Sequence, residues 1–418
     1  MRTRLHTASA LPEAGRLIAE YRRFASAQAQ TDAASAQQAL FISPSRSLLC
    51  QGVRASLALA AQDDLAQAAA RLLQAQHDPH ALLFGVLPFD NRELAHLRVP
   101  ARTLQGRRLR HLAPLKNSAA RREAHLLPQP AQQAHYQHAV RSAVQAITRG
   151  ELHKVVLARS LDLQVRAAGF DLAAIVQGLA ERNQAGYSWA IDLPQSPRRT
   201  LLAASPELVL ARDGMQVRSH PLAGSIARAA DPQEDHRRAA GLLASVKDLQ
   251  EHAPVVQAIA ETLRPYCKRL HVPATPQLVA TPTMWHLGTL IEGELAAPVS
   301  SLELAIALHP TPAVCGVPRQ AAADFLQAHE GFAREMYAGL CGWSDAQGNG
   351  EWALNLRCAD MQRSTEHWRM RLYAGAGIVQ GSEPEAEWLE TEGKLRTLLR
   401  GLQMEYLLEQ PGALAEAA

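Results

Sequence analysis

The sequence has few of the features that mark disulfide-rich, zinc-binding or nucleic-acid-binding proteins. Its five cysteines are scattered and never spaced as CxxC, which argues against a disulfide framework and a structural zinc site. Aromatic residues make up only 5% of the chain, so there are few stacking platforms for single strands. The net charge is only +3 over 418 residues, without a basic stripe. We therefore expect no nucleic-acid partner.

Long apolar runs and common cofactor motifs are also missing. Near the N-terminus, Leu17-Ile18-Ala19 is cut short by Glu20 and Arg22, so neither a signal peptide after the basic Met1–Leu5 stretch nor a membrane span is expected. No HExxH pattern occurs, which disfavours a zinc hydrolase. The glycines at 374–379 lack the GxGxxG spacing of a dinucleotide site. The remaining composition, 47% hydrophobic and 20% charged, is that of a globular protein, which we expect in the cytoplasm.

The hydrophobic pattern becomes clearer after the first third of the chain. Residues 1–130 are rich in Ala, Gln and Arg and carry no clustered chemistry, so we expect them to form the N-terminal part of the fold. Strands from distant segments mixed with long helices predict an α/β or α+β fold with extensive sheet. The patterns predict strands over 154–159, 201–210 (interrupted by Ser205-Pro206-Glu207), 351–359 and 368–374, and helices over 136–147, 235–263 and 385–402.

Two of the predicted helices carry acidic residues on one face. The two groups, each at spacings of three and four, are Glu387, Glu390 and Lys394, and Asp248, Glu251 and His252. Two helices that each present carboxylates could jointly hold a hard divalent cation, because Mg²⁺ is bound by a few carboxylates plus substrate oxygens and waters. From spacing alone, solvated faces with an ordinary ion pair are the commoner explanation.

Two residues could act as an acid–base pair. Lys154 lies in an apolar strand, and a lysine that loses hydration in a closed pocket has a lowered pKa and can act as a base. The alternative is a lysine on the wet face of a half-buried strand. Glu207 follows Ser205-Pro206 inside an apolar run, where a raised pKa would suit a general acid. A turn carboxylate that caps nearby amides is an equally good explanation.

Other polar residues and glycines could form binding positions. Arg357 is in phase with Asn355 in the predicted 351–359 strand and could grip a carboxylate with two hydrogen bonds, although a surface salt bridge is the commoner outcome. His286 is a lone histidine in apolar company, more often a core residue than a catalyst. The stretches 221–225 and 374–379 contain glycines that let backbone approach a ligand, or simply make turns.

Taken in order along the chain, these features resemble the chorismate-utilising enzymes, a family of isochorismate, salicylate, anthranilate and aminodeoxychorismate synthases. The resemblance covers residues 131–402. It is carried by GELHKVVLAR (150–159), ASPEL (204–208), HPLAGS (220–225), KDLQEH (247–252), MWHL (284–287), LHPTPAVCG (308–316), GLCGW (339–343), LRCA (356–359), YAGAGIV (373–379) and EWLETEGK (387–394).

The resemblance implies a fold, a metal and a substrate. It implies two large, mainly antiparallel β-sheets packed face to face with helices outside, a catalytic region over 131–404 and a tail over 405–418. Glu251 and Glu390 resemble the Mg²⁺ ligands, with Glu387 helping directly or through water, and the ion would bind the ring carboxylate of chorismate. The expected substrate-binding residues are Gly224, Ser225, His286, Ala313, Val314, Tyr337, Arg357, Ala374, Gly375 and Lys394.

Three positions distinguish between activities within the family. Lys154 stands where members that use water carry a lysine base, and Ala223 stands where aminodeoxychorismate synthases carry an attacking lysine. Ala313 resembles isochorismate synthases, whereas salicylate synthases tend to have threonine there. The resemblance therefore implies an isochorismate synthase, in which Lys154 activates water for attack on C2 and Glu207 protonates the departing C4 hydroxyl.

Several alternatives stay open at this stage. The same site could belong to a salicylate synthase or to a menaquinone-pathway isochorismate synthase, although 312–316 and 387–391 look more like siderophore-pathway members. Val314 and Tyr337 depart from the leucine and phenylalanine found in some of those members. A different class of function is an inactive chorismate-binding subunit. Because water is the expected nucleophile, no glutamine amidotransferase partner is needed, and we expect a monomer.

Overall fold

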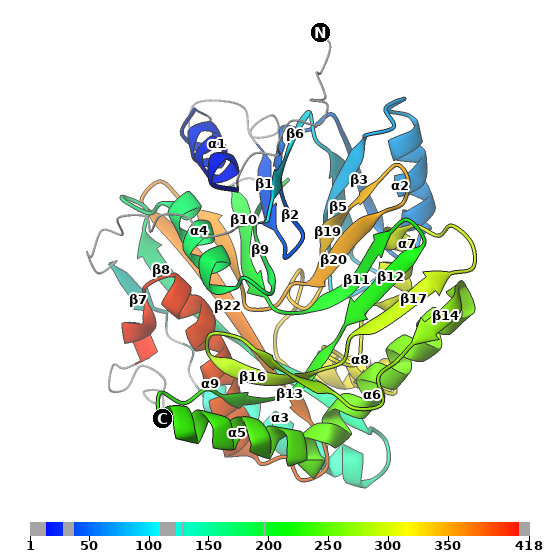
Figure 1. Ribbon diagram of the computed structural model, residues 1–418. Coiled ribbons are helices and arrows are strands. Elements are labelled where there is room, and N and C mark those ends of the chain that lie inside the picture. Colours follow the sequence, from blue (N-terminus) through cyan, green and yellow to red (C-terminus); the bar gives the residue numbers. More distant parts are fainter. Residues whose placement is uncertain are drawn as a thin grey trace.

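The molecule is built on two large β-sheets and one small one (Figure 1). The structure is a computed structural model that describes residues 14–27, 37–108, 123–127, 129, 131–194 and 198–408. The segment Met1–Leu5 and residues 409–418 of the expected tail lie outside these ranges. Within the described residues, no helix has both the length and the apolar composition to cross a membrane.

The first large sheet has ten strands, and neighbouring strands run antiparallel. Its order is β18 (Gly316–Val317), β8 (Lys154–Arg166), β22 (His367–Ile378), β21 (Cys358–Arg363), β10 (Arg199–Ser205), β9 (Tyr187–Leu193), β1 (Gln38–Ile42), β2 (Arg46–Gln51) and β6 (Arg102–Arg107), with β7 (Ala124–Leu126) on β8. The long β8–β22 pair aligns Lys154-Val155-Val156 with the glycine-containing end of β22, where Val156 lies opposite Gly377.

The second large sheet has nine strands and is also antiparallel. Its order is β14 (Cys267–His271), β17 (Ile291–Leu295), β12 (Gln216–His220), β11 (Leu208–Asp213), β20 (Gly350–Leu354), β19 (Leu340–Asp345), β4 (Leu82–Leu87), β5 (Leu94–Val99) and β3 (Ala55–Ala60). A small third sheet has the order β13 (Leu222–Ala227), β16 (Met284–Gly288) and β15 (Gln277–Ala280).

The helices cover the outer faces of the sheets (Figure 1). The ten-stranded sheet is covered by α1 (Ala14–Ala27), α3 (Gln132–Thr148), α4 (Leu172–Arg182) and α9 (Pro384–Gly401). The nine-stranded sheet is covered by α2 (Leu65–Gln74) and α7 (Ser301–Leu308), and the small sheet by α5 (Pro232–Ala244) and α6 (Val246–Leu263). Helix α8 (Arg319–His329) packs on β8 and β18. The predicted architecture of two antiparallel sheets with helices outside is confirmed.

The main core lies between the two large sheets. In β1, Phe41 belongs to this inter-sheet core, whereas its neighbour Leu40 belongs to the layer under α1 and α4. Phe41 meets Phe84 of the nine-stranded sheet edge-on, with ring centroids 5.9 Å apart. Because successive strand residues face opposite sides and both sides are covered, β1 is fully buried and reads as a continuous apolar run.

Two predicted elements are each split in the structure. The expected strand 351–359 is wrong as a single element, because β20 ends at Leu354 in one sheet and β21 begins at Cys358 in the other. The alternation of apolar and polar residues in the sequence does not reveal the break, because a buried strand lies on each side of it. The expected helix 235–263 breaks at Ser245, whose side chain accepts a hydrogen bond from the Asp248 amide and caps α6.

Two neighbouring crossings of the chain between the two large sheets position the functional residues. One crossing carries Glu207 between β10 and β11, and the other carries Arg357 between β20 and β21. Backbone hydrogen bonds join them, from the Leu354 amide to the Glu207 carbonyl (3.2 Å) and from the Ala204 amide to the Arg357 carbonyl (3.1 Å). Polar side chains are therefore brought together in a region that is otherwise apolar.

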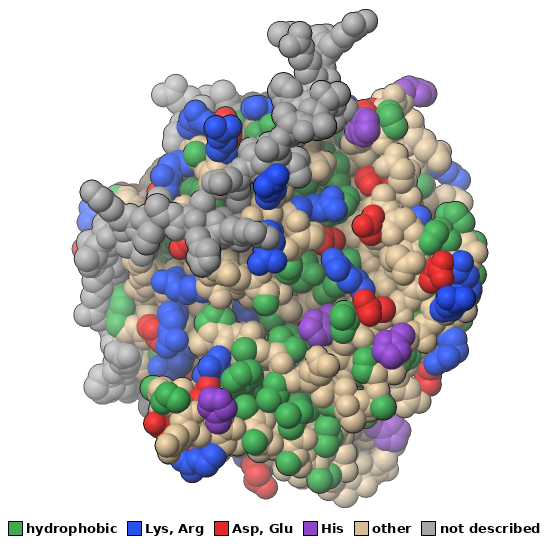
Figure 2. All heavy atoms as spheres, in the orientation of Figure 1, with side chains coloured by type: hydrophobic (Ala, Val, Ile, Leu, Met, Phe, Trp, Pro, Cys, Tyr) green, Lys and Arg blue, Asp and Glu red, His purple; other side chains and the backbone are tan. Residues whose placement is uncertain are grey.

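On the face shown in Figure 2, basic and acidic side chains are interspersed with other side chains rather than gathered in one continuous basic stripe.

Candidate active site

A cavity opens beside the two crossings. Its empty space, including the open mouth, is about 650 Å³. Among the residues expected from the sequence, those that line it are Glu207, Gly224, Ser225, Glu251, His286, Ala313, Val314, Tyr337, Arg357, Ala374, Gly375 and Lys394. Lys154 and Glu390 contact lining residues directly, and Glu387 lies one layer further out. The structure thus brings the whole expected set to one place.

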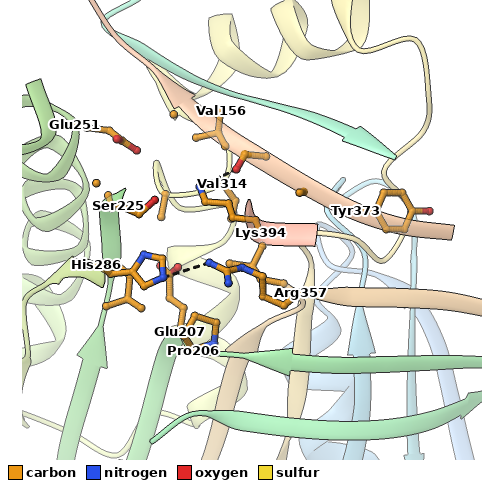
Figure 3. A pocket seen from close by; sticks show the side chains of 18 of the residues that line it. Val156, Pro206, Glu207, Ser225, Glu251, His286, Val314, Arg357, Tyr373 and Lys394 are labelled. Carbon is orange, nitrogen blue, oxygen red and sulfur yellow. Dashed lines mark hydrogen bonds between the residues drawn. The ribbon is translucent and has the colours of Figure 1, made fainter. Parts of the chain in front are cut away.

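Arg357 and His286 form a buried cationic end of the cavity. Arg357 has a left-handed backbone (φ 48°), which directs its side chain out of the crossing rather than along a strand. Its guanidinium donates to His286 Nε2 (3.2 Å) and to Thr397 Oγ1 (3.1 Å), as Figure 3 shows for the histidine. Burial, followed by the Arg357 charge, lowers the pKa of His286 well below its usual range. The histidine is therefore neutral and holds the arginine in place.

Glu207 is a carboxyl group kept from water. Only 4% of the residue is exposed. Burial raises the pKa of Glu207 to about 8, although Lys154, Lys394 and Arg357 act in the opposite direction. At neutral pH this carboxyl is mainly protonated and can give a proton. The alternative of a carboxyl group that caps nearby amides holds in part, because a backbone hydrogen bond from Leu222 lowers the pKa of Glu207, but burial has the larger effect.

Lys154 is completely buried at the start of β8, so it does not lie on a wet strand face. Its ammonium donates to the backbone carbonyl of Glu251 (3.2 Å) and lies 3.4 Å from the Glu251 carboxylate. Burial lowers the pKa of Lys154, although Glu251 opposes this effect. Val156, two residues along the same face of β8, lines the cavity, which places the lysine at the edge of the same wall.

The three candidate metal ligands lie in a group of alternating charges. Each carboxylate meets a different lysine: Glu251 meets Lys154, Glu387 meets Lys247 (2.6 Å), and Glu390 meets Lys394 (2.5 Å). The Ser225 hydroxyl also donates to Glu390 (3.1 Å). Glu387 is only 1% exposed, so the alternative of a solvated helix face does not hold for α9.

The pKa values of the buried carboxyl groups on α9 depend on the lysines beside them. Burial, followed by the nearby Glu390, raises the pKa of Glu387 to about 7 even though Lys247 is in contact with it. Burial would also raise the pKa of Glu390, but Lys394 and Lys247 lower it below its usual range. In the part of the chain that the structure describes, no three acidic, histidine or cysteine side chains are already gathered as a metal-binding set.

Glycines in β22 make room on the cavity wall. A Cβ at Gly377 would lie 2.0 Å from Glu251 Oε1, and one at Gly375 would lie 2.9 Å from the Tyr337 hydroxyl. The Gly375 carbonyl accepts a hydrogen bond from Lys394 (2.9 Å). The stretch 374–379 is therefore strand up to Ile378, and its glycines admit neighbouring side chains rather than forming a turn.

The remaining wall is largely apolar and faces the cationic end. Val156, Val314 and Tyr373 line the cavity; in Figure 3 the two valines lie near Lys394, Tyr373 lies apart from them, and Glu251 and Glu207 are well separated. Tyr337 stacks on Tyr373 with ring centroids 4.7 Å apart. The cavity therefore combines apolar and aromatic side chains with two basic ones, Arg357 and Lys394.

The sequence did not predict three of the residues at or beside the cavity, and one histidine that it grouped with the carboxylates lies elsewhere. Lys247, Val156 and Tyr373 were not singled out, and the chain's scarcity of lysine could have pointed to Lys247, because only five lysines occur in 418 residues. His252, grouped with Glu251 by spacing, does not face the carboxylates. It donates to the Ala223 carbonyl (3.1 Å) and accepts from Thr289 (2.8 Å), and burial lowers its pKa to about 4.

Comparisons with known proteins agree with this geometry. Residues 67–403 match a family model described as "Chorismate binding enzyme". The chain is 45% identical to isochorismate synthase DhbC of Bacillus subtilis over 331 residues, which cover 78% of this chain and 82% of the relative. It is 38% identical to the vibriobactin-specific isochorismate synthase of Vibrio cholerae, over 82% of this chain and 85% of the relative.

A solved structure is also similar. The crystal structure of DhbC from Bacillus anthracis superposes with a TM-score of 0.82 at 40% identity, covering 93% of this chain and 99% of that one.

Proposed function

The chain belongs to the chorismate-binding enzymes, and on that premise we propose that it is an isochorismate synthase, which adds water to chorismate at C2 and removes the C4 hydroxyl. The observation that carries the proposal is a buried carboxyl group with a raised pKa, Glu207, that lines the cavity, together with a buried lysine, Lys154, that contacts the lining residue Glu251. An isomerisation that moves a hydroxyl group requires one group to take a proton from water and another to give one.

Substrate binding follows from the charges that line the cavity. Chorismate is a dianion at neutral pH, and Arg357 and Lys394 are the cations that face the cavity. Burial lowers the pKa of Arg357 to about 10, so it still carries its charge at pH 7. Its planar guanidinium can bind a carboxylate with two parallel hydrogen bonds. We propose that Arg357 holds the enolpyruvyl side with neutral His286, while Val314 and Tyr337 contact the ring.

The acid–base step then conserves atoms and protons. In its neutral form, Lys154 takes a proton from water as the oxygen bonds to C2, and the ring double bonds shift. Glu207 gives its proton to the C4 oxygen, which leaves as water. The two side chains end with opposite protonation and return to the starting state by exchange with solvent. Because substrate and product have similar bonds, the reaction is reversible and requires a downstream step that consumes the product.

Two observations indicate that the cluster of three carboxylates suits Mg²⁺. Glu251, Glu387 and Glu390 offer the hard oxygen ligands that this ion prefers, and Gly377 leaves the space into which Glu251 projects. We propose that Glu251 and Glu390 hold the ion, with Glu387 directly or through water. When bound, Mg²⁺ would neutralise and orient the ring carboxylate.

Replacing Glu390 with alanine is expected to weaken Mg²⁺ binding at least about tenfold and to raise KM for chorismate, because one carboxylate of the site is lost. Isothermal titration of the enzyme with Mg²⁺ measures this effect. Glu392→Ala is the matched control on the same helix, since Glu392 pairs with Arg396 away from the cavity. Equal Mg²⁺ affinity of Glu390→Ala and wild type would remove Glu390 from the ligand set.

Product analysis tests the activity directly. The purified enzyme with chorismate and Mg²⁺ is expected to give isochorismate as the main product, separated by liquid chromatography. Salicylate and pyruvate as main products would show a salicylate synthase instead. Tight chorismate binding without turnover would show an inactive binding subunit.

We propose that the enzyme supplies siderophore synthesis in the cytoplasm and acts as a monomer without a glutaminase partner. The support is the vibriobactin-specific relative and the use of water, which needs no ammonia donor. An isochorismatase gene beside its own and loss of growth of a deletion strain in iron-limited medium are the expected results. A menaquinone requirement of that strain would point to the other pathway.

Size-exclusion chromatography with light scattering measures the oligomeric state.

A further inference from the structure

Arg334 is a buried arginine behind the cavity wall, and the mechanism above does not use it. It lies between α8 and β19, and only 6% of the residue is exposed. Its Nη1 donates to the Val314 carbonyl (2.6 Å), and its Nη2 donates to the Val156 carbonyl (2.6 Å). Val314 and Val156 both line the cavity but belong to segments far apart in the sequence. One guanidinium therefore joins two neighbouring segments of the cavity wall.

The same residue also supports a third segment of the cavity wall. The Tyr337 amide donates to the Arg334 carbonyl (2.8 Å), so the turn that presents Tyr337 to the cavity begins at Arg334. The guanidinium lies over the Phe89 ring at 4.4 Å, which holds it flat. Arg334 thus connects Val156, Val314 and Tyr337 without touching the substrate space itself.

Glu330 fixes the direction of the guanidinium. Its carboxylate accepts from Arg334 Nε (2.7 Å) and Nη2, and it also accepts from the Ala158 amide on β8 (2.8 Å). The spacing between the nitrogens of a guanidinium is rigid, so the distance between the two bound carbonyls is set. A lysine ammonium could pair with Glu330 but could not hold both carbonyls in this way.

Other contacts keep the segments folded when this bridge is weakened. The Val156 amide donates to the Cys315 carbonyl (2.8 Å), and Gly316 pairs with Val155 in the β18–β8 ladder. These bonds keep the 313–316 segment beside β8. Because one guanidinium binds both carbonyls, Val314 and Val156 are neighbours in one part of the cavity wall, and the bridge acts on their fine position there.

We propose that Arg334, held by Glu330, is a positioning residue that sets how closely the wall formed by Val156, Val314 and Tyr337 approaches the ring, and so confines the enzyme to isomerisation. This inference rests on the proposed isochorismate synthase activity. A narrow cavity holds the ring where water reaches C2, and it prevents the enolpyruvyl group from folding over the ring after isochorismate has formed.

The reaction that a wider cavity would permit is a defined one. The hydrogen on C2 of isochorismate passes to the methylene carbon of the enolpyruvyl group, and the C3–O bond breaks. The ring becomes aromatic, giving one salicylate and one pyruvate without any oxidant or added water. This step needs the methylene carbon to lie over C2, which a narrow cavity opposes.

Two variants test the proposal. Arg334→Lys keeps the charge beside Glu330, and the double variant Glu330→Gln/Arg334→Met removes both buried charges together. Both are expected to lower kcat about 10- to 100-fold, since a displacement of about 1 Å costs this much. The share of salicylate and pyruvate among the products is expected to rise at the same time. Chromatography of both products gives the two readouts from one reaction.

Arg98→Met is the matched control. Arg98 is equally buried (6% exposed) and also donates to a backbone carbonyl, that of Asp192 (2.8 Å), but neither residue lines the cavity. This variant is expected to lower Tm while leaving kcat and the product ratio unchanged. The same changes in Arg98→Met as in Arg334→Lys would overturn the proposal, as would wild-type kcat and product ratio in Arg334→Lys.

Hydrogen exchange separates this inference from the proposed function. The amides of Val314 and Cys315 donate to the Thr311 carbonyl, and the positioning role predicts faster exchange of these amides in Arg334→Lys but not in Arg98→Met. If the wild type formed no isochorismate, the proposed function would fail and exchange would still test the bridge. Unchanged exchange in Arg334→Lys would overturn the bridge alone.

Discussion

Replacing Lys154 with alanine is expected to lower kcat for isochorismate formation by about 10²- to 10⁴-fold, the range that one general base contributes. Water is a weak nucleophile, and Lys154 is the buried amine at the edge of the cavity wall. Burial lowers the pKa of Lys154, and a base must be neutral to accept a proton, so wild-type activity should fall as the pH drops through that pKa. The Lys154→Ala variant should lose this acidic limb of the pH–rate profile.

Small amines provide the decisive measurement for Lys154. In Lys154→Ala, methylamine or ethylamine can enter the space vacated by the side chain, and part of the lost rate should return as the concentration of free amine rises. Lys268→Ala is the control, because Lys268 pairs with Glu294 at the surface and its removal should leave kcat unchanged. Wild-type kcat in Lys154→Ala would show that another group activates water.

The sequence already contained the elements that carry the site. The helical spacing of Glu387, Glu390 and Lys394 predicted a shared face, and α9 presents that face to the cavity region. The apolar neighbours of Lys154 predicted a buried strand, which β8 is. Such a strand can be predicted from the sequence because a sheet that is buried on both faces requires a continuous run of apolar residues. The ordered family motifs then indicated that these segments belong to one site.

The connections between distant segments were not predictable from local pattern. Arg357 was expected at the end of one strand, but it lies at a crossing between sheets, because the alternation of apolar residues is the same on both sides of the break. Arg334 carries no local signal at all, since its partners Val156 and Val314 are 178 and 20 residues away in the sequence. Its role arises only when the fold brings these backbone carbonyls together.

The lysines illustrate how charge and burial act together at this site. Three of the five lysines in the chain, Lys154, Lys247 and Lys394, each meet a different buried carboxylate. An isolated buried carboxylate is costly, so each pair compensates its partner. Glu207 has no such partner among the ion pairs of the described residues, and its pKa is raised accordingly.

Replacing Glu207 with glutamine is expected to lower kcat by about 10²- to 10⁴-fold, because the amide keeps the shape of the carboxyl group but cannot supply a proton to the C4 oxygen. The pKa of Glu207 is raised to about 8 by burial, so wild-type activity should fall as the pH rises above about 8 and the acid is lost. The alkaline limb should be absent in Glu207→Gln. The pH–rate profiles of kcat/KM for the two proteins measure this difference.

The same substitution should stabilise the fold at alkaline pH, which is opposite in sign to its effect on catalysis. Below the ordinary pKa of 4.5 the carboxyl group is protonated in both the folded and the unfolded chain. As the pH rises towards 8, the unfolded chain ionises first, so the wild type loses about 1.4 kcal/mol of stability per pH unit. Glutamine does not titrate, and Glu207→Gln should therefore gain in Tm over the wild type between pH 5 and pH 8. An equal Tm difference at both pH values would mean that Glu207 is ionised in the folded protein, and then it could not serve as the acid.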